Sequence, residues 1–291
     1  MASQRDIKRR IKSIKSTAQI TKAMQMVAAA RMRRAQERVA ASRPYAGNIR
    51  EIVADISGRS GAASHPLLQQ REVRNVGLVM VTPDRGLAGP LVTNINREAL
   101  RLVRSLEKPF RVVTVGRKAR TFSTRLGWDR VAEFTEIGDQ PGISDASPVA
   151  RQVLDMYEAG DVDVVYLVYS EFVSTLRQNP KRVQLLPVVP PETTDESGDD
   201  GHDSPWEYEP DDPEKVLSSL LPRYIEFSLF QALLENSASE QSARMVAMSA
   251  ATDAANDLVK DLSLLANKAR QAEITKEISE ISGAAEALRL G

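Results

Sequence analysis

The chain has 291 residues, enough for one medium domain beside long helices, and its 39 Lys and Arg residues balance its 39 Asp and Glu residues. The neutral total therefore points to no partner on overall charge, and the absence of cysteine excludes disulfides, thiol chemistry and Cys-ligated zinc. Only His65 and His202 are present, which leaves little for a catalytic triad or an imidazole metal site. No apolar run approaches the ~20 residues of a membrane-spanning helix.

The charges are unevenly distributed along the chain. Residues 1–43 contain twelve Lys and Arg residues against two acidic ones, whereas residues 191–214 contain eleven acidic residues and no Lys or Arg. The basic, amphipathic start has the composition of a mitochondrial transit peptide. Its helical pattern nevertheless continues without a break to Val39. We therefore expect mature structure from the start and a cytoplasmic location in a bacterial-type cell.

The two ends of the chain are predicted to be long helices. Residues 1–43 and 223–282 contain neither Gly nor Pro, the residues that are least favourable inside a helix. In both segments small, apolar or uncharged polar residues recur at alternating steps of four and three, the heptad seam of a left-handed coiled coil. The seam positions are Ile7, Ile11, Ile14, Ala18, Thr21, Gln25, Ala28, Met32, Ala35 and Val39, and then Ala238, Gln241, Met245, Met248, Thr252, Ala255, Val259, Leu262, Ala266 and Ala269.

A second register follows after a skip of five residues, at Ile274, Ile278, Ile281, Ala285 and Leu288. Such a skip changes the supercoil locally. Because both seams are poor in Leu and rich in Ala, Met and polar residues, they predict a slender, smooth shaft within one chain rather than a dimerising zipper.

The middle of the chain predicts an α/β domain. Near-continuous apolar runs at residues 76–82, 110–115 and 162–169 are typical of buried parallel strands, and residues 183–189 are a candidate for another strand. Helical patterns at 91–106, 117–126 and 150–159 lie between them. The alternation favours βαβ units around a mostly parallel sheet.

No nucleotide, metal or catalytic motif is recognisable in this middle region. The turn after the first strand, residues 83–90, has Gly86 and Gly89 but neither G-x-G-x-x-G nor a P-loop, so we interpret it as a structural turn. The acidic stretch lacks the spacing of a calcium-binding hand and is interpreted as a solvated loop. We therefore predict no catalytic residue, no metal site and no cofactor.

The order of these parts, with RGLAG after the first strand, resembles the γ-subunit family of the F-type ATP synthases from end to end. The longest matching stretches are residues 20–29 (ITKAMQMVAA), 240–248 (EQSARMVAM), 250–254 (AATDA) and 267–275 (NKARQAEIT). Two features depart from the family pattern: Ala88-Gly89 where Cys-Gly is frequent, and a longer acidic insertion at residues 192–203. That insertion lacks the cysteine pair of redox-regulated forms.

The resemblance implies an antiparallel two-helix coiled coil formed by the terminal helices, with a central Rossmann-like α/β domain. The expected boundaries are 1–58 for the first helix, 59–212 for the α/β domain with an acidic loop near 191–212, and 213–291 for the last helix. The implied role is that of the central-stalk rotor of a proton-translocating ATP synthase at the cytoplasmic face of the cell membrane. Such a subunit is not itself an enzyme.

The implied partners are the α and β subunits of the catalytic hexamer, the ε subunit and the membrane c-ring. By the family pattern, Met24, Arg244, Gln271 and Thr275 would contact the β subunit. The loop with Tyr208, Glu209 and Asp211 would lie towards the c-ring or ε, and residues 283–291 would form the tip of the shaft.

Two other classes of protein remain open at this point. A basic helix joined to a coiled coil is also the outline of a nucleic-acid-binding protein. In such proteins, however, the basic region extends beyond the zipper, whereas here Lys and Arg flank the seam within the same heptads. A nucleotide-binding enzyme or oxidoreductase built on the central sheet is the second alternative.

Overall fold

The computed structural model describes residues 4–57, 65–189 and 213–290. It divides into two compact units, which we treat separately: the coiled-coil unit, Met1–Val27 with Met245–Gly291, and the α/β unit, Ala28–Arg244. Helices α1 (Gln4–Ser57) and α5 (Pro213–Leu290) contribute to both. None of the helices in the described ranges is long and apolar enough to cross a membrane. The predicted domain boundaries, at 58/59 and 212/213, lie at or beside residues outside these ranges and stay predictions.

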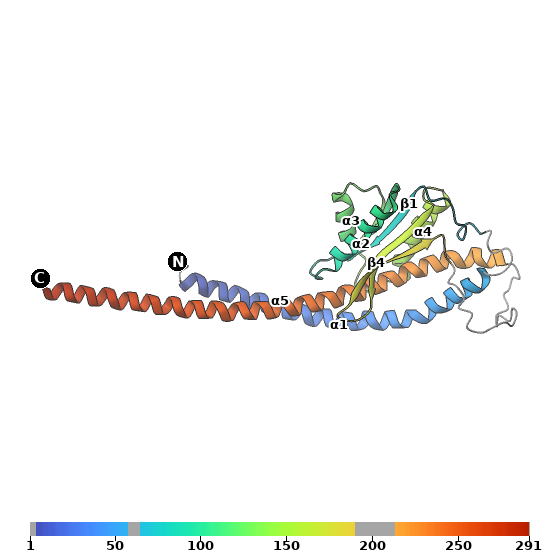
Figure 1. Ribbon diagram of the computed structural model, residues 1–291. Helices are drawn as coiled ribbons and strands as arrows, with labels where there is room; N and C mark the ends of the chain where they lie inside the picture. Colours follow the sequence, from blue (N-terminus) through green and yellow to red (C-terminus); the bar gives the residue numbers. More distant parts are fainter. Residues whose placement is uncertain (1–3, 58–64, 190–212, 291) are drawn as a thin grey trace, which may run out of the picture. The chain divides into compact units, whose positions relative to one another are not determined.

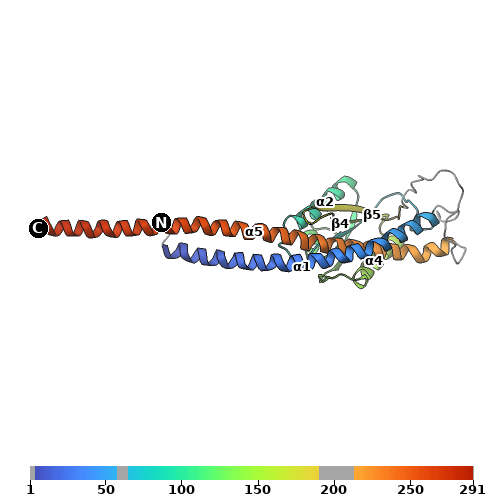
Figure 2. The ribbon, with the colours of Figure 1, turned by 90° about the horizontal axis from the view of Figure 1, so that it is seen from below.

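In the coiled-coil unit, the beginning of α1 lies beside α5 and runs in the opposite direction (Figure 2). The hydroxyl groups of Thr21 and Thr252 are 2.7 Å apart, which fixes the register of the two helices. In the α/β unit, the Ser42 hydroxyl of α1 donates to Gln231 Oε1 of α5, so the two helices are in contact there too. The predicted seam is confirmed, because it forms the buried or half-buried side of each helix.

The α/β unit is built on a five-stranded sheet with the order β3-β2-β1-β4-β5 (Figure 1). Strands β1, β2, β3 and β4 are parallel, and β5 pairs antiparallel with β4. The strands are β1 (Val76–Val81), β2 (Phe110–Val115), β3 (Arg130–Phe134), β4 (Val164–Phe172) and β5 (Gln178–Leu186). The helices between them are α2 (Leu91–Leu106), α3 (Arg117–Arg125) and α4 (Ile143–Glu158).

Successive side chains of β1 point to opposite faces, so this strand belongs to two cores. Leu78 and Met80 pack in the core that contains residues of α2 and α3. Val79 and Val81 pack in the core that contains residues of α4, of α5 and of the end of α1. Because both faces are covered, all six residues of β1 are buried, which explains its unbroken apolar sequence.

The fold class is confirmed, with corrections in detail. Strand β3 was not predicted, because its charged residues and edge position hide the apolar signal of a buried strand. Helix α4 begins at Ile143 and runs through Pro148, whereas the sequence predicted a start at residue 150. The earlier start is capped by the Asp145 carboxylate, which accepts a hydrogen bond from the Gly142 amide. Strand β5 begins at Gln178 rather than at residue 183. Its first residues are polar, and they form a strand because their backbone pairs with β4.

Candidate functional site

The end of α5 forms an uncovered helical surface in the coiled-coil unit. Every residue from 270 to 285 is exposed. Three isoleucines lie on this exposed segment: Ile274, Ile278 and Ile281 are 47%, 61% and 70% exposed. A helix that stays in water along its whole surface would not need such large apolar side chains. The predicted second register is therefore an apolar stripe that no part of the coiled-coil unit covers within the described residues. A helix that is apolar along one exposed side is typical of a surface for a partner.

Two predicted contact residues lie on this uncovered segment. Gln271 and Thr275 are exposed and four residues apart, so they share one face of the helix. The Thr275 hydroxyl donates to the Gln271 backbone carbonyl at 2.9 Å, a bond within the helix that does not involve the Gln271 side chain. Met24, on α1, is half-buried. Gln271 and Thr275 are thus exposed, with the Thr275 hydroxyl bonded within the helix, and Met24 is exposed in part.

Arg244 occupies a different environment, in the α/β unit. Its residue exposure is 8%, and it has three partners within the chain. Nη1 donates to Gln241 Oε1 at 3.1 Å, while Nη2 donates to Glu240 Oε1 at 2.5 Å and to the Gly86 carbonyl at 3.2 Å. Burial raises the pKa of Glu240 above its ordinary value, and the Arg244 guanidinium opposes that rise. Arg244 therefore joins α5 to the turn after β1.

The carboxyl edge of a doubly wound sheet is where such folds usually bind ligands, and the start of α3 lies there. Here the chain itself satisfies the first three amides of α3. The Arg117 amide donates to Asp84 Oδ1 at 2.8 Å, the Lys118 amide to the Pro83 carbonyl at 3.3 Å, and the Ala119 amide to Thr82 Oγ1 at 2.7 Å. A phosphate group at this helix start would have to displace the Asp84 carboxylate.

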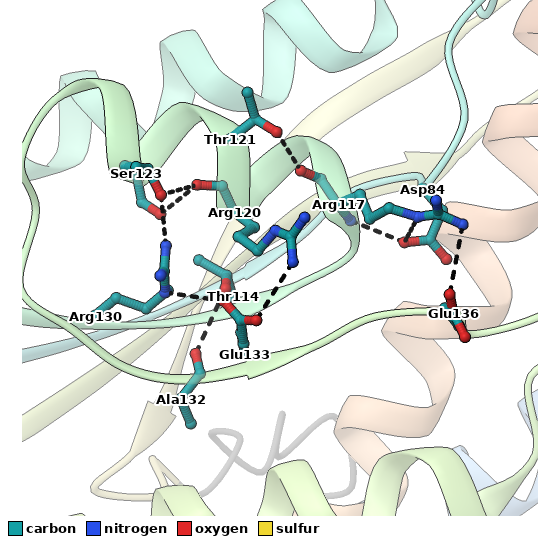
Figure 3. A network of polar contacts seen from close by, with 11 residues as sticks. Asp84, Thr114, Arg117, Arg120, Thr121, Ser123, Arg130, Ala132, Glu133 and Glu136 are labelled. Atoms are coloured by element: carbon teal, nitrogen blue, oxygen red, sulfur yellow. Dashed lines mark hydrogen bonds and ion pairs between the residues drawn. The ribbon is translucent and has the colours of Figure 1, made fainter.

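Figure 3 shows how the charges around α3 are matched. The Arg117 side chain lies between Asp84 and Glu136, and Glu133 on β3 pairs with both Arg120 and Arg130. These pairs are partly exposed, so each adds little to stability. They give the edge strand β3 a charged rim, which discourages pairing with another chain. Among the described residues, no group of three His, Cys, Asp or Glu side chains is placed to hold a metal ion.

Several residues that the sequence predicted as functional lie outside the described ranges, and one residue with notable contacts was not predicted. Tyr208, Glu209, Asp211 and His202 are outside the described residues. Sequence reasoning missed Asp139, which bonds to both long helices, because an isolated Asp after a Gly has no motif around it. The one available signal was its position in a loop of the α/β unit.

A family model described as ATP synthase matches residues 3–288 of the chain. The chain is 50% identical over 288 residues to the ATP synthase gamma chain of Desulforamulus reducens, covering 99% of this chain and 100% of the relative. It is 49% identical over 294 residues to the ATP synthase gamma chain of Chloroflexus aurantiacus, with 99% of each chain covered.

Solved structures show the same architecture. A chain from the cryo-EM structure of the Tetrahymena thermophila mitochondrial ATP synthase central stalk and c-ring aligns with a TM-score of 0.61 at 26% identity, covering 80% of this chain and 99% of that one. A chain of the Euglena gracilis mitochondrial ATP synthase (OSCP, F1 and c-ring, rotational state 3) aligns with a TM-score of 0.69 at 20% identity, covering 99% and 95%. The second likeness concerns the fold alone.

Proposed function

Because the chain belongs to the ATP synthase gamma-chain family, as a non-catalytic rotor subunit, we propose that it couples rotation of a membrane c-ring to nucleotide-affinity changes in catalytic β subunits. The observation that carries this proposal is the uncovered end of α5, residues 270–285. An asymmetric shaft that presents different faces to three β subunits gives each a different contact. Only such differential contact shifts a conformational equilibrium.

The proposed contact with the β subunit consists of Met24, Gln271 and Thr275, together with Arg244. Gln271 and Thr275 are supported by their exposed positions and shared helical face. Met24 offers a polarizable apolar surface from α1. Arg244 would reach a β-subunit carboxylate only by exchanging its present bonds to Glu240 and Gly86.

The apolar stripe of Ile274, Ile278 and Ile281 and the tip at residues 283–291 are proposed to turn within an apolar collar formed by the α and β subunits. Small and apolar side chains are suited to such a bearing, because they offer no directional bond to resist rotation. The proposed opposite end is the α/β unit with Tyr208, Glu209 and Asp211, directed to the c-ring or ε. The complex would then lie at the cytoplasmic face of the cell membrane, with this chain as a peripheral component.

The nucleic-acid alternative gains no support, since neither relative described above is named as a nucleic-acid-binding protein. Identifying the subunits that copurify with the chain from native membranes tests the proposed assembly directly. Recovery of α, β, ε and c subunits is the expected result. Recovery of the chain without the α and β subunits would refute the proposal.

A charge on the stripe tests the bearing. Ile278→Asp, in the reconstituted complex, is expected to lower ATP synthesis driven by a proton gradient, because the collar would have to accommodate a carboxylate. Ile278→Leu keeps the apolar surface and is the matched control, for which we expect synthesis near the unmodified rate. Equal rates for the two variants would count against a bearing at this position.

A further inference from the structure

Asp139, in the loop between β3 and α4, joins both long helices to the α/β unit. Arg31 Nη1 of α1 lies 2.5 Å from Asp139 Oδ2. From α5, Gln241 Nε2 donates to Asp139 Oδ1 at 3.3 Å, and the Ser237 hydroxyl donates to the Asp139 carbonyl at 3.1 Å. A single residue of the loop thus receives bonds from three side chains on two helices.

The bonds continue from Asp139 to the other side of α5. Gln241 is 1% exposed, and its Oε1 accepts a bond from Arg244, which in turn donates to Gly86 in the turn after β1. A continuous chain of side-chain bonds therefore runs from α1 through the loop and α5 to that turn. We call Arg31, Asp139, Gln241 and Arg244 the neck network. All four residues lie in the α/β unit.

The position of the network suggests a mechanical role. The α/β unit ends at Ala28 on α1 and at Arg244 on α5, so the network lies where both helices continue into the coiled-coil unit. Near this point the buried contacts between the helices come from Ala35, Val39 and Ala238 with Leu234. The hydrophobic effect behind contacts of this kind is non-directional. Hydrogen bonds and ion pairs have preferred angles, and they resist rotation about the helix axis.

We propose that Asp139 is a positioning residue that clamps α1 and α5 to the α/β unit against twisting load. In a rotor, torque passes along α1 and α5, the two helices that contribute to both units. The clamp makes the two helices turn with the sheet, so that less of the rotation is lost as elastic twist. The inference rests on the rotor role of the chain and adds a residue that holds both long helices to the α/β unit.

The test uses single-molecule rotation of the complex of this chain with α and β subunits, with a bead attached to the α/β unit. Asp139→Asn and Arg31→Gln each remove the ion pair while keeping a polar side chain, which in Asp139→Asn also has the same size. We expect a broader distribution of bead angles at a fixed catalytic pause, that is, a loss of torsional stiffness. The rate of ATP hydrolysis should be retained, because neither residue belongs to the proposed β-subunit surface.

A matched control is Asp257→Asn, which removes an exposed ion pair to Lys260 within one helix. It should leave the angular distribution unchanged. The double variant Asp139→Asn with Arg31→Gln should be little softer than either single one, because both remove the same interaction. An unmodified complex that fails to rotate would instead contradict the rotor role.

Unchanged angular widths in both single variants would overturn the proposal. So would additive softening in the double variant, since it would mean that the two residues act separately. Failure of both single variants to assemble would equally count against a clamp, whose loss should soften a rotor that still forms. Restoration of the narrow distribution by Asp139→Glu, relative to Asp139→Asn, would support the role of the carboxylate.

Discussion

The coiled-coil unit and the α/β unit share two helices but hold them by different interactions. In the coiled-coil unit the seam consists largely of Ala, Met, Thr and Ile, and the end of α5 is uncovered. In the α/β unit the same helices are fixed by a large apolar core and by the neck network. The comparison shows that the two long helices have small and apolar side chains in the coiled-coil unit, which suits the proposed rotation inside a partner. In the α/β unit, the same helices are held by apolar packing and by directional polar bonds.

The largest effect on the free energy of unfolding is expected at Gly116, a tightly packed position of the α/β unit. Gly116 has φ +94°, and a Cβ atom there would lie 1.9 Å from the Thr82 carbonyl oxygen. We expect Gly116→Ala to lower the free energy of unfolding by about 4 kcal/mol or more, from backbone strain and overpacking together. Denaturant unfolding followed by circular dichroism measures this change.

Gly127 is the matched control, because it also has positive φ (+66°) but no atom within 4 Å of an added Cβ. Gly127→Ala should lower the free energy of unfolding by only about 1 kcal/mol, because only the left-handed backbone conformation disfavours alanine there. Equal losses at the two glycines would show that the tight packing at Gly116 is not decisive.

The next effect concerns a buried charge. Arg244→Ala leaves the Glu240 carboxylate buried without its cation, and we expect a loss of about 3 kcal/mol in the free energy of unfolding. Arg270→Ala removes an exposed arginine from the same helix and should change stability by less than about 0.5 kcal/mol. In the assembled complex, Arg244→Ala is also expected to slow ATP synthesis.

The same variant has a predictable pH dependence. Burial raises the pKa of Glu240, and Arg244 lowers it, so Arg244→Ala should raise that pKa further. A carboxyl whose folded-state pKa is raised destabilises the protein when ionised, and this cost disappears as the pH falls below its unfolded-state pKa. The variant should therefore lose more stability relative to the unmodified chain at about pH 8 than at about pH 5. In the background of Glu240→Gln, this pH dependence of the Arg244→Ala effect should vanish.

A smaller effect is expected in the seam of the coiled-coil unit. Ala255 is buried between the two helices. Ala255→Leu should push the helices apart and lower the free energy of unfolding by about 1–2 kcal/mol. Ala254→Leu, at an exposed position one residue away, should be nearly neutral. Thermal unfolding of the two variants, followed by helix content, distinguishes them. A neutral Ala255→Leu would mean that the helices are not closely packed there.

The smallest effect on folding should come from the tip. Truncation after Ser282 removes residues of which the first three are exposed, so we expect a change of less than about 0.5 kcal/mol in the free energy of unfolding. In the complex, however, the truncation should weaken the proposed bearing while ε and the c-ring stay bound. Release of ε with the hexamer still bound would show that the proposed orientation is reversed.

Local patterns in the sequence determined much of this architecture. Most of α1 and α5 follows from long segments without Gly or Pro, although α1 continues through Pro44 and α5 includes Pro222, and the seam follows from steps of three and four residues. The buried strand β1 follows from a continuous apolar run, because a strand covered on both faces has few polar positions, and β2 follows from a mostly apolar run. Each of these signals lies within a single element, so neighbouring residues suffice to reveal it. The exposed face of Gln271 and Thr275 is read from helical spacing in the same way.

Tertiary structure alone decided the rest. Strand β3 exists because β2 offers it an edge, and its own five residues carry little signal of a strand. The hydrogen bond between Arg244 and Gly86 spans 158 residues, and the one between Gln241 and Asp139 spans 102 residues. Contacts of this kind arise where elements cross in space, and no periodicity within one element records which distant side chain will be its partner.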